Sequence, residues 1–223
     1  MPNKALVNEI KTSYPDVQLI MASKYLKENE FSPFIEAGIH DFGESRVEAL
    51  EAKLPVLQTF DVAIHFLGTL QTKKVKKIIN QIDCLHSLDR LKLAKEIDKR
   101  RATPLKCFVQ VNISNEPQKY GVPMEQVKSF LQNVQGYDNI QVIGLMGMAE
   151  LTEDEAVITE QFQALKTLKD TLKKTYPNVD SLSMGMSNDY PIALKMGSTH
   201  LRLGRILLDG GAFNEKETAK KSV

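Results

Sequence analysis

Two neighbouring segments near the end of the chain carry residues that suit phosphate binding. Leu182–Asp189 ends an apolar stretch in a tight turn of small residues, in which Asn188 or Asp189 can cap the following helix. Gly197–Arg205 contains a short apolar strand with Arg202 inside it. Glycine lets a backbone approach an anion closely, and free N–H groups at a helix start point toward it. We expect one phosphate between the two turns; an ordinary pair of strand-to-helix turns is the alternative.

A single lysine adds a second chemistry. Lys24 follows the apolar run Val17–Ala22 and Ser23, so we expect its amine at the end of a strand buried on both faces, in low dielectric. Desolvation there would disfavour the ammonium and make the amine nucleophilic. An amine beside a phosphate indicates Schiff-base chemistry with a phosphate-bearing aldehyde, and this points to pyridoxal 5'-phosphate (PLP). The alternative is a lysine that extends from a strand end into solvent.

A repeated strand–helix unit is needed to position these residues, and the hydrophobic pattern predicts one. Strands are expected at residues 17–22, 39–42, 62–67, 84–87, 105–113, 140–146, 181–184 and 200–203, and helices at 2–13, 30–37, 46–57, 71–79, 89–101, 124–133, 154–174 and 190–196. Eight such units without a break in composition predict a single (β/α)8 TIM barrel, an α/β fold. An open doubly wound sheet is the alternative, but it would more often carry a glycine fingerprint after its first strand.

A barrel places the ends of all its strands around one mouth. Phosphate usually binds there after the seventh and eighth strands, which is where the two segments fall. The other strand ends are Lys24, residues 43–45, 68–69 and 86–87, Asn112 and Met146. We expect them to ring the same mouth.

The composition excludes several classes of protein. With a net charge of +1, the chain of 223 residues has no broad field to attract nucleic acid or an acidic membrane, and no apolar run reaches the ~18 residues of a membrane span. Cys84 and Cys107 lie in apolar stretches, so we expect buried thiols in a reducing compartment, the cytoplasm. One domain is expected over residues 1–223, with an N-terminal helix at 2–13 and a polar tail from about residue 214.

A series of short motifs, in a fixed order, makes the sequence recognisable. They are Ala22-Ser23-Lys24, Phe42-Gly43-Glu44, His65-Phe66-Leu67-Gly68-Thr69-Leu70-Gln71, His86-Ser87-Leu88-Asp89-Arg90, Gln110-Val111-Asn112-Ile113-Ser114, Lys119-Tyr120-Gly121, Gly144-Leu145-Met146, residues 182–187 with Asp189, Gly197-Ser198-Thr199 and Leu201-Arg202-Leu203-Gly204. Together they resemble the YggS-like pyridoxal phosphate homeostasis proteins, called PROSC proteins in animals. The resemblance implies a barrel of the alanine racemase N-terminal-domain type, PLP held as a Schiff base, and a role in supplying or buffering that cofactor.

The resemblance also implies a role for individual residues. By position, Lys24 forms the Schiff base. Ser187 and the backbone around Met186 form a turn that binds the phosphate, and Gly204 closes the other side of the phosphate site. Arg202 is assigned to the phosphate or to the pyridine nitrogen, with the choice open. An arginine at that nitrogen would keep it unprotonated and weaken the ring as an electron sink, which suits carrying the cofactor better than using it.

Three further positions complete the expected cofactor site. Leu67 ends the third strand in one of the shared motifs. Ser45 stands where the family usually has asparagine, so a contact near the ring is expected to differ. Arg205 stands where a small residue is usual, and it either adds a phosphate partner or crowds the turn.

An enzyme of the alanine racemase type is the main alternative function. Such enzymes take a second acid/base residue from a C-terminal β domain of a partner subunit; this chain ends soon after its last strand. We therefore expect a monomeric PLP carrier that passes the cofactor to apo-enzymes and is not itself an enzyme. A barrel aldolase would place its lysine on the sixth strand, where this chain has Met146, and no ligand spacing predicts a metal. His40, His65, His86 and His200 are expected to be core or hydrogen-bonded structural residues.

Overall fold

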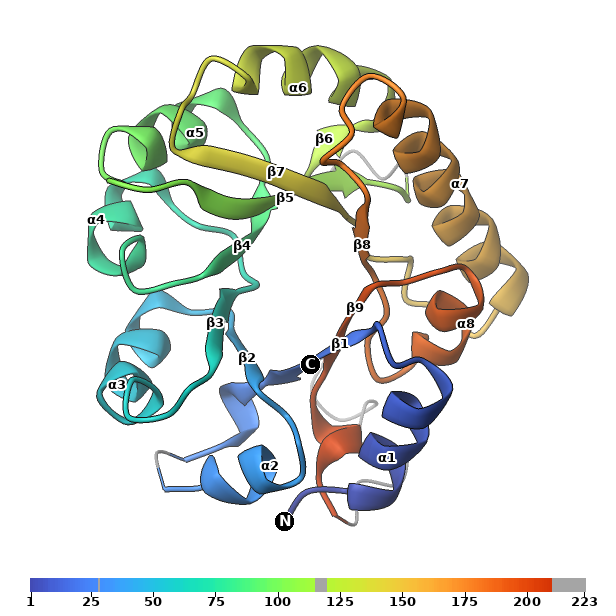
Figure 1. Cartoon of the computed structure of the whole chain (residues 1–223). Helices are drawn as coiled ribbons and strands as arrows, with labels where there is room; N and C mark the ends of the chain where they lie inside the picture. Colours follow the sequence, from blue (N-terminus) through green and yellow to red (C-terminus); the bar gives the residue numbers. More distant parts are fainter. Residues whose placement is uncertain (28, 115–119, 210–223) are drawn as a thin grey trace, which may run out of the picture.

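The computed structural model of the chain describes residues 1–27, 29–114 and 120–209. Parallel strands form a ring at the centre, and helices surround it (Figure 1). The tail expected from about residue 214 and Lys119 of one motif lie outside the described residues. Within the described part, no helix combines the length and the apolarity needed to cross a bilayer.

Eight parallel strands build the ring within the described residues. They are β1 (Gln18–Ala22), β2 (Asp41–Glu44), β3 (Ala63–Phe66), β4 (Cys84–Leu88), β5 (Leu105–Asn112), β7 (Ile140–Met146), β8 (Ser181–Ser183) and β9 (His200–Leu203). They pair in the order β4-β3-β2-β1-β9-β8-β7-β5, and β5 pairs with β4 to close the ring. An unexpected two-residue strand, β6 (Val122–Pro123), adds to β5. The predicted (β/α)8 barrel is confirmed, and the open sheet is wrong.

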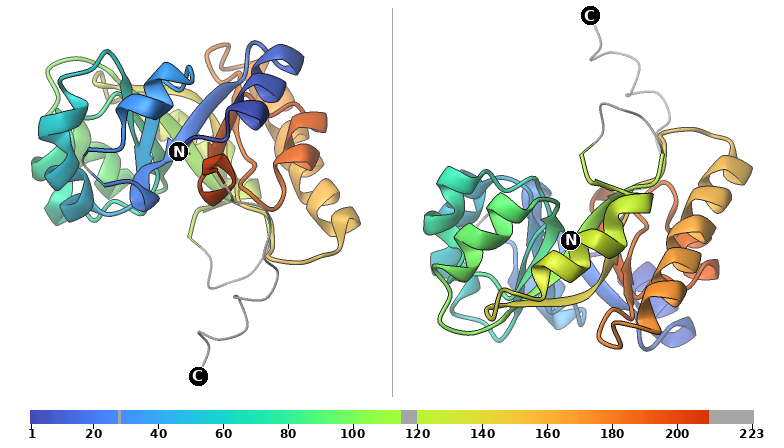
Figure 2. Two further views of the ribbon diagram at one scale, coloured as in Figure 1. Left: turned by 90° about the horizontal axis from the view of Figure 1, so that it is seen from below. Right: turned by 90° about the horizontal axis from the view of Figure 1, so that it is seen from above.

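Helices cover the outside of the ring because each has one apolar face. They are α1 (Lys4–Ser13), α2 (Ser32–Glu36), α3 (Val47–Leu57), α4 (Val75–Ile78), α5 (Leu91–Asp98), α6 (Val127–Val134), α7 (Glu155–Lys173) and α8 (Tyr190–Lys195). In α5 the buried residues Leu93, Ala94 and Ile97 share one side of the helix. Figure 2 shows α3 to α5 and α7 to α8 on opposite sides of the strands.

The two ends of the described chain are joined at the β1–β9 seam. Leu19 pairs with Leu201 in the parallel ladder between the first and the last strand. Before β1, the N–H of Asn3 donates to the carbonyl of Leu207 at 2.7 Å, and the Asn3 side chain caps α1. Because the strands are parallel, the turn that follows β1 lies beside the turn that follows β9.

The inside of the ring contains several buried polar side chains. A large apolar cluster fills the space between strands and helices, whereas Cys84, Phe108 and Met146 form a separate small cluster. His65, His86 and His200 are buried and hydrogen-bonded, as expected. The expectation for His40 is wrong: it lies just before β2, in the connection from α2, and is exposed.

Candidate functional site

Lys24 lies in the 3-10 turn Ser23–Tyr25 that directly follows β1. Ser23 is buried, but Lys24 is exposed, so the expectation that its amine lies in low dielectric is wrong. The physical reason is local: the strand ends at Ala22, and the tight turn carries the next side chain out to the rim. The amine is therefore accessible to a ligand that enters the mouth.

Tyr25 connects Lys24 with the turn after the last strand. The Lys24 Nζ lies 5.0 Å from the centroid of the Tyr25 ring, which is a cation–π distance. The edge of the same ring packs so closely on Gly204 that a Cβ there would lie 2.6 Å from Tyr25 Cε2. Glycine permits this approach without displacement of the ring. The amine and the Gly204 backbone are thus separated by one aromatic ring.

The turn after β8 presents backbone N–H groups. Its shape depends on Gly185, which has φ of +96° and packs on Ala193 and Leu201. The N–H groups of Asp189 and Tyr190 return to the Met186 carbonyl, and those of Ser187 and Asn188 have no acceptor among the described residues. Two adjacent free donors are what an oxyanion requires.

Asp189 has a different role from the one expected of a helix cap. Its carboxylate makes no capping bond to α8 and instead accepts a hydrogen bond of 2.6 Å from the Met186 N–H. The Met186 N–H is therefore occupied, which leaves the N–H groups of Ser187 and Asn188 as the donors of this turn that have no acceptor in the part of the chain that the structure describes. Burial raises the pKa of Asp189, while the Met186 hydrogen bond and Arg202 oppose that rise.

Arg202 is a buried cation inside the ring. Its Nη1 donates to Ser183 Oγ at 2.6 Å and its Nη2 to the Gly147 carbonyl at 3.1 Å, so the guanidinium reaches from β9 across to the ends of β8 and β7. Burial lowers its pKa to about 10, and Asp189 opposes that shift. Arg202 therefore stays charged near neutral pH, in a position fixed by two acceptors.

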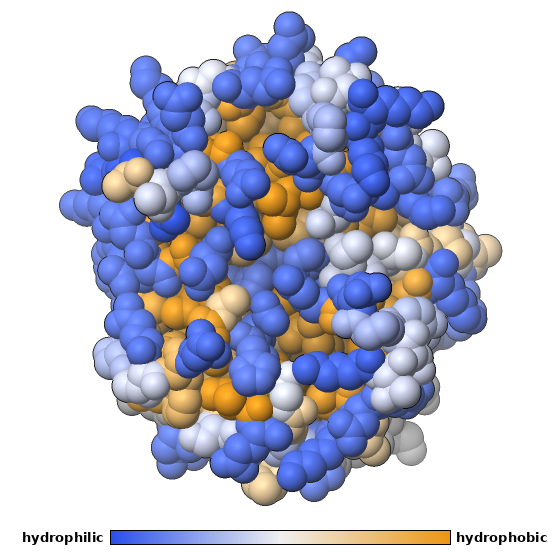
Figure 3. Space-filling model, in the orientation of Figure 1, coloured by the Kyte–Doolittle hydropathy of each residue, from blue (hydrophilic) through white to orange (hydrophobic). Residues whose placement is uncertain are grey.

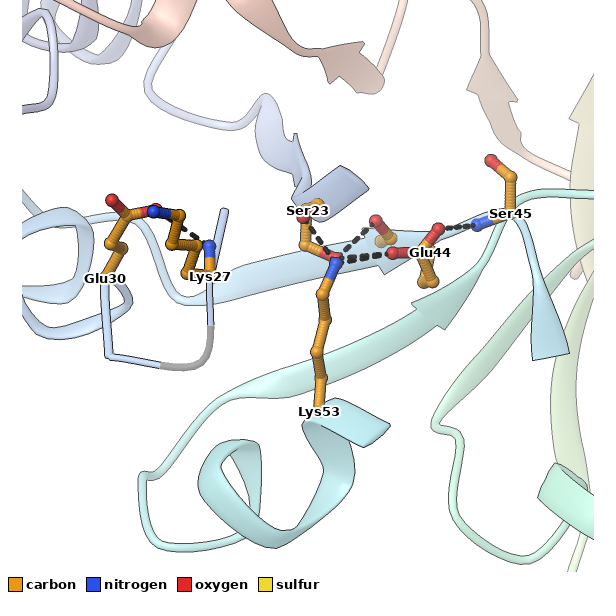
Figure 4. A network of polar contacts seen from close by, with 7 residues as sticks. Ser23, Lys27, Glu30, Glu44, Ser45 and Lys53 are labelled. Carbon is orange, nitrogen blue, oxygen red and sulfur yellow. Dashed lines mark hydrogen bonds and ion pairs between the residues drawn. The ribbon is translucent and has the colours of Figure 1, made fainter. Parts of the chain in front are cut away.

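A buried ion pair lies beneath the Lys24 turn (Figure 4). Lys53 of α3 donates to Glu44 Oε2 at 2.7 Å and to the Ser23 carbonyl at 2.6 Å. The other oxygen of Glu44 accepts the Ser45 N–H at 2.8 Å. One ammonium thus ties the turn after β1 to the end of β2.

The remaining expected site residues lie on neighbouring strand ends. Leu67 follows β3, is half-buried against Gly43, and donates its N–H to the Glu44 carbonyl at 2.8 Å. Ser45 follows β2 and is exposed. Arg205 is exposed at the start of the 3-10 turn that follows β9, and Met186 is 36% exposed and not packed in the core as Met184 is.

Two clefts of the described surface lie away from this rim. One is lined by Pro104, Ile140, Val179 and residues of α6, and the other by Val62, Ile82 and Arg101. These residues precede or begin their strands, so the clefts open on the opposite face from the strand ends. They are separate from the site that Lys24, Ser187 and Arg202 define.

Sequence reasoning missed three residues that shape the site: Tyr25, Lys53 and Ser183. Lys53 had a readable signal, because it falls on the apolar stripe of α3 with Leu50, Leu54 and Leu57. A lysine on such a stripe needs a buried acceptor, and Glu44 is that acceptor. Tyr25 and Ser183 carried no such signal, because the contacts of Tyr25 with Gly204 and of Ser183 with His86 join segments that are far apart in the sequence.

The chain is similar to known proteins over most of its length. The family model for the alanine racemase N-terminal domain matches residues 9–210. A pyridoxal phosphate homeostasis protein of Aquifex aeolicus is 35% identical over 195 residues, 85% of this chain and of that protein. A protein of the same name from Haemophilus influenzae is 31% identical over 212 residues, 92% of this chain and 89% of that one. The chain belongs to the alanine racemase N-terminal domain family, within the pyridoxal phosphate homeostasis proteins.

Solved structures agree with this assignment. PipY of Synechococcus elongatus, in a structure with PLP bound, has a TM-score of 0.82 and 30% identity, covering 93% of this chain and all of that one (100%). Alanine racemase of Corynebacterium glutamicum has a TM-score of 0.75 at 13% identity, covering 92% of this chain and 61% of that one. The second match supports the barrel fold alone.

Proposed function

We propose that the chain binds PLP at the mouth of the barrel, with the Lys24 amine as its covalent attachment point, and serves intracellular homeostasis of that cofactor. The observation that carries this proposal is the shared contact with Tyr25. An accessible amine and the Gly204 backbone lie on the same ring, beside a turn with two free N–H donors. The chemistry that PLP supplies when bound is condensation of its aldehyde with an amine.

The phosphate would be held by the turns after β8 and β9. Ser187 and Asn188 supply free N–H groups, Gly204 permits close approach of the backbone, and the exposed Arg205 can reach an anion at the rim. The Met186 N–H donates to Asp189 and is not available to the phosphate. In this proposal Met186 contributes to phosphate binding through the backbone conformation of its turn.

Arg202 is assigned to the ring of the cofactor, not to its phosphate. Its two hydrogen bonds hold the guanidinium inside the ring, against Ser183 at the end of β8 and the Gly147 carbonyl after β7. Leu67 and Ser45 lie on the other side of the mouth, beyond the Lys24 turn. A permanent cation beside the pyridine nitrogen disfavours protonation of that nitrogen.

A carrier role fits these features better than racemase chemistry does. Relatives of this chain carry the name of homeostasis proteins, which is not the name of an enzyme. We propose delivery of the cofactor to apo-enzymes, a monomeric state and a cytoplasmic location. The buried free thiols Cys84 and Cys107 agree with a reducing compartment. On the face shown in Figure 3, hydrophilic side chains divide the apolar patches, which agrees with a monomer.

Replacing Lys24 tests the proposed attachment. Lys24→Ala, incubated with PLP and freed of excess, should lack a visible absorption band and a borohydride-stable adduct, because the amine is gone. Lys27→Ala is the matched control, since Lys27 is also exposed and only three residues away. The wild type and the control should show both signals, with the adduct mapped to Lys24. A stable adduct on another lysine would contradict the proposal.

A further inference from the structure

A continuous chain of hydrogen bonds crosses the inside of the barrel. It runs from Arg202 to Ser183 Oγ (2.6 Å), from Ser183 Oγ to His86 Nδ1 (2.8 Å), from His86 Nε2 to His65 Nδ1 (3.0 Å), and from His65 Nε2 to Asp41 Oδ1 (2.9 Å). The links come from five different strands. Both imidazoles are buried, and the Asp41 side chain is 22% exposed.

When both histidines are neutral, the two ends of this chain determine the direction of every bond in it. Arginine can only donate, and a carboxylate can only accept. His65 must therefore carry its proton on Nε2 toward Asp41, which makes its Nδ1 an acceptor for His86 Nε2–H. The Nδ1 of His86 then accepts the hydroxyl proton of Ser183, and Ser183 Oγ accepts from Arg202. All four bonds point the same way with both histidines neutral, and bonds so aligned polarise one another.

The surroundings of His86 favour the neutral form. Burial lowers its pKa well below the usual value, and His65, Arg202 and His200 add to the shift. The groups that face it are His65 on β3, Cys84 on β4, Phe108 on β5, Ser183 on β8, and His200 and Arg202 on β9. A protonated His86 would lie beside the Arg202 cation and would have no carboxylate of its own to compensate its charge.

We propose that this directional relay, Arg202–Ser183–His86–His65–Asp41, positions Arg202 toward the ring of the bound cofactor. The inference rests on the proposed function for the identity of the ligand. Ser183 and the Gly147 carbonyl hold the two ends of the guanidinium, and the relay ensures that Ser183 offers Arg202 a lone pair and not its proton. Ser183, His86 and His65 are thus positioning residues.

A metal centre is the rival use of the same side chains. His65, Cys84 and His86 offer three ligand atoms within 4.8 Å of one another. The relay is favoured because the facing nitrogens are already at hydrogen-bonding distance and because burial raises the pKa of the Cys84 thiol, which opposes the thiolate a metal needs.

The tautomers can be measured in the cofactor-free full chain. Long-range proton–nitrogen spectra of the protein labelled with ¹⁵N-histidine should give both His65 and His86 as neutral Nε2–H rings at pH 7. Ser183→Ala should move the Nδ1 resonance of His86, and the matched control Ser129→Ala, an exposed serine of α6 far outside the relay, should move neither ring. An Nδ1–H tautomer or a cation at His86 would overturn the relay, as would stoichiometric loss of both signals on adding Zn²⁺.

A second experiment tests whether the relay affects binding of the cofactor through its ring nitrogen. Ser183→Ala should weaken PLP binding by about tenfold, the weight of one hydrogen bond to a charged group, and should change binding of a PLP analogue with carbon in place of the ring nitrogen by less than about twofold. If Ser183→Ala does not fold, His86→Phe removes the hydrogen bond between Ser183 and His86 and keeps an aromatic ring against Phe108. Equal losses for both ligands would overturn the positioning role. If the wild type binds no PLP, the proposed function is wrong, and so is the proposed effect of the relay on the cofactor. The spectra of the cofactor-free protein test the hydrogen-bond relay independently of PLP binding.

Discussion

At the scale of the residue, charge and burial divide the site into two kinds of group. Lys24 is exposed and free to react, whereas Arg202, His86 and His200 are buried, with protonation set by their surroundings. Burial, then the nearby His65, lowers the pKa of His200 to about 3. Its side chain is satisfied as a neutral ring by Thr199, at 2.7 Å. A histidine that is buried as a neutral ring makes the folded state less stable in acid.

We expect His200 to make folding less favourable as the pH falls. The unfolded chain takes up a proton at His200 below about pH 6.5, while the folded chain does not until about pH 3. The unfolded state therefore binds more protons in that range, and stability is lost by up to roughly 1.4 kcal/mol per pH unit. Urea unfolding of His200→Gln at pH 7, 6 and 5 should show a smaller loss than the wild type. The exposed His40→Gln should keep the wild-type slope; an unchanged slope in His200→Gln would refute the idea.

At the scale of the element, one helix holds two strand ends in register. Lys53 of α3 reaches Glu44 at the end of β2 and the carbonyl of Ser23 in the turn after β1 (Figure 4). The Glu44 side chain is 1% exposed and that of Lys53 is 11% exposed. Removal of one partner from a buried pair leaves the other charge uncompensated, which costs far more than the loss of a surface pair.

Lys53→Met should therefore lower the free energy of unfolding by about 3–5 kcal/mol, measured by chemical denaturation. The matched control is Lys74→Met, which removes an ion pair to Glu48 on the exposed side of the same helix and should have little effect. The double variant Lys53→Met with Glu44→Leu should recover part of the loss. A single variant as stable as the control would contradict a role for the pair in holding the Lys24 turn.

At the scale of the whole molecule, closure of the barrel makes the site a meeting point of distant segments. Lys24 follows the first strand, while Ser187 and Gly204 follow the last two, and β1 pairs directly with β9. A ligand that contacts all three turns binds the closed barrel and not the unfolded chain. Its binding energy must then add to the stability of the fold.

PLP at 100 times its dissociation constant should raise the free energy of unfolding by about 2.7 kcal/mol. Thermal or urea unfolding with and without the cofactor measures this. Pyridoxal, which lacks the phosphate, should stabilise much less at the same concentration, and Lys24→Ala should lose most of the gain. Equal stabilisation by PLP and pyridoxal would mean that the turns after β8 and β9 do not bind the phosphate.

The sequence was sufficient for the architecture. All eight strands of the ring were predicted within a few residues, because buried parallel strands need continuous apolar runs, and these can be read locally. The same logic predicted which turns share the mouth, since every turn after a strand lies at one end of a barrel. The burial of His65, His86 and His200 also followed from their places in strands.

Local pattern failed where a contact joins segments far apart in the chain. The exposure of Lys24, the occupation of the Met186 N–H by Asp189 and the direction of Arg202 each depend on a turn geometry or a partner that hydrophobic periodicity does not encode. Composition and order alone thus determined the barrel, the family and the end of the barrel at which we propose the cofactor site. Only the tertiary structure decided which donors are free, because a hydrogen bond is directional and depends on ångström distances that exist only once the ring has closed.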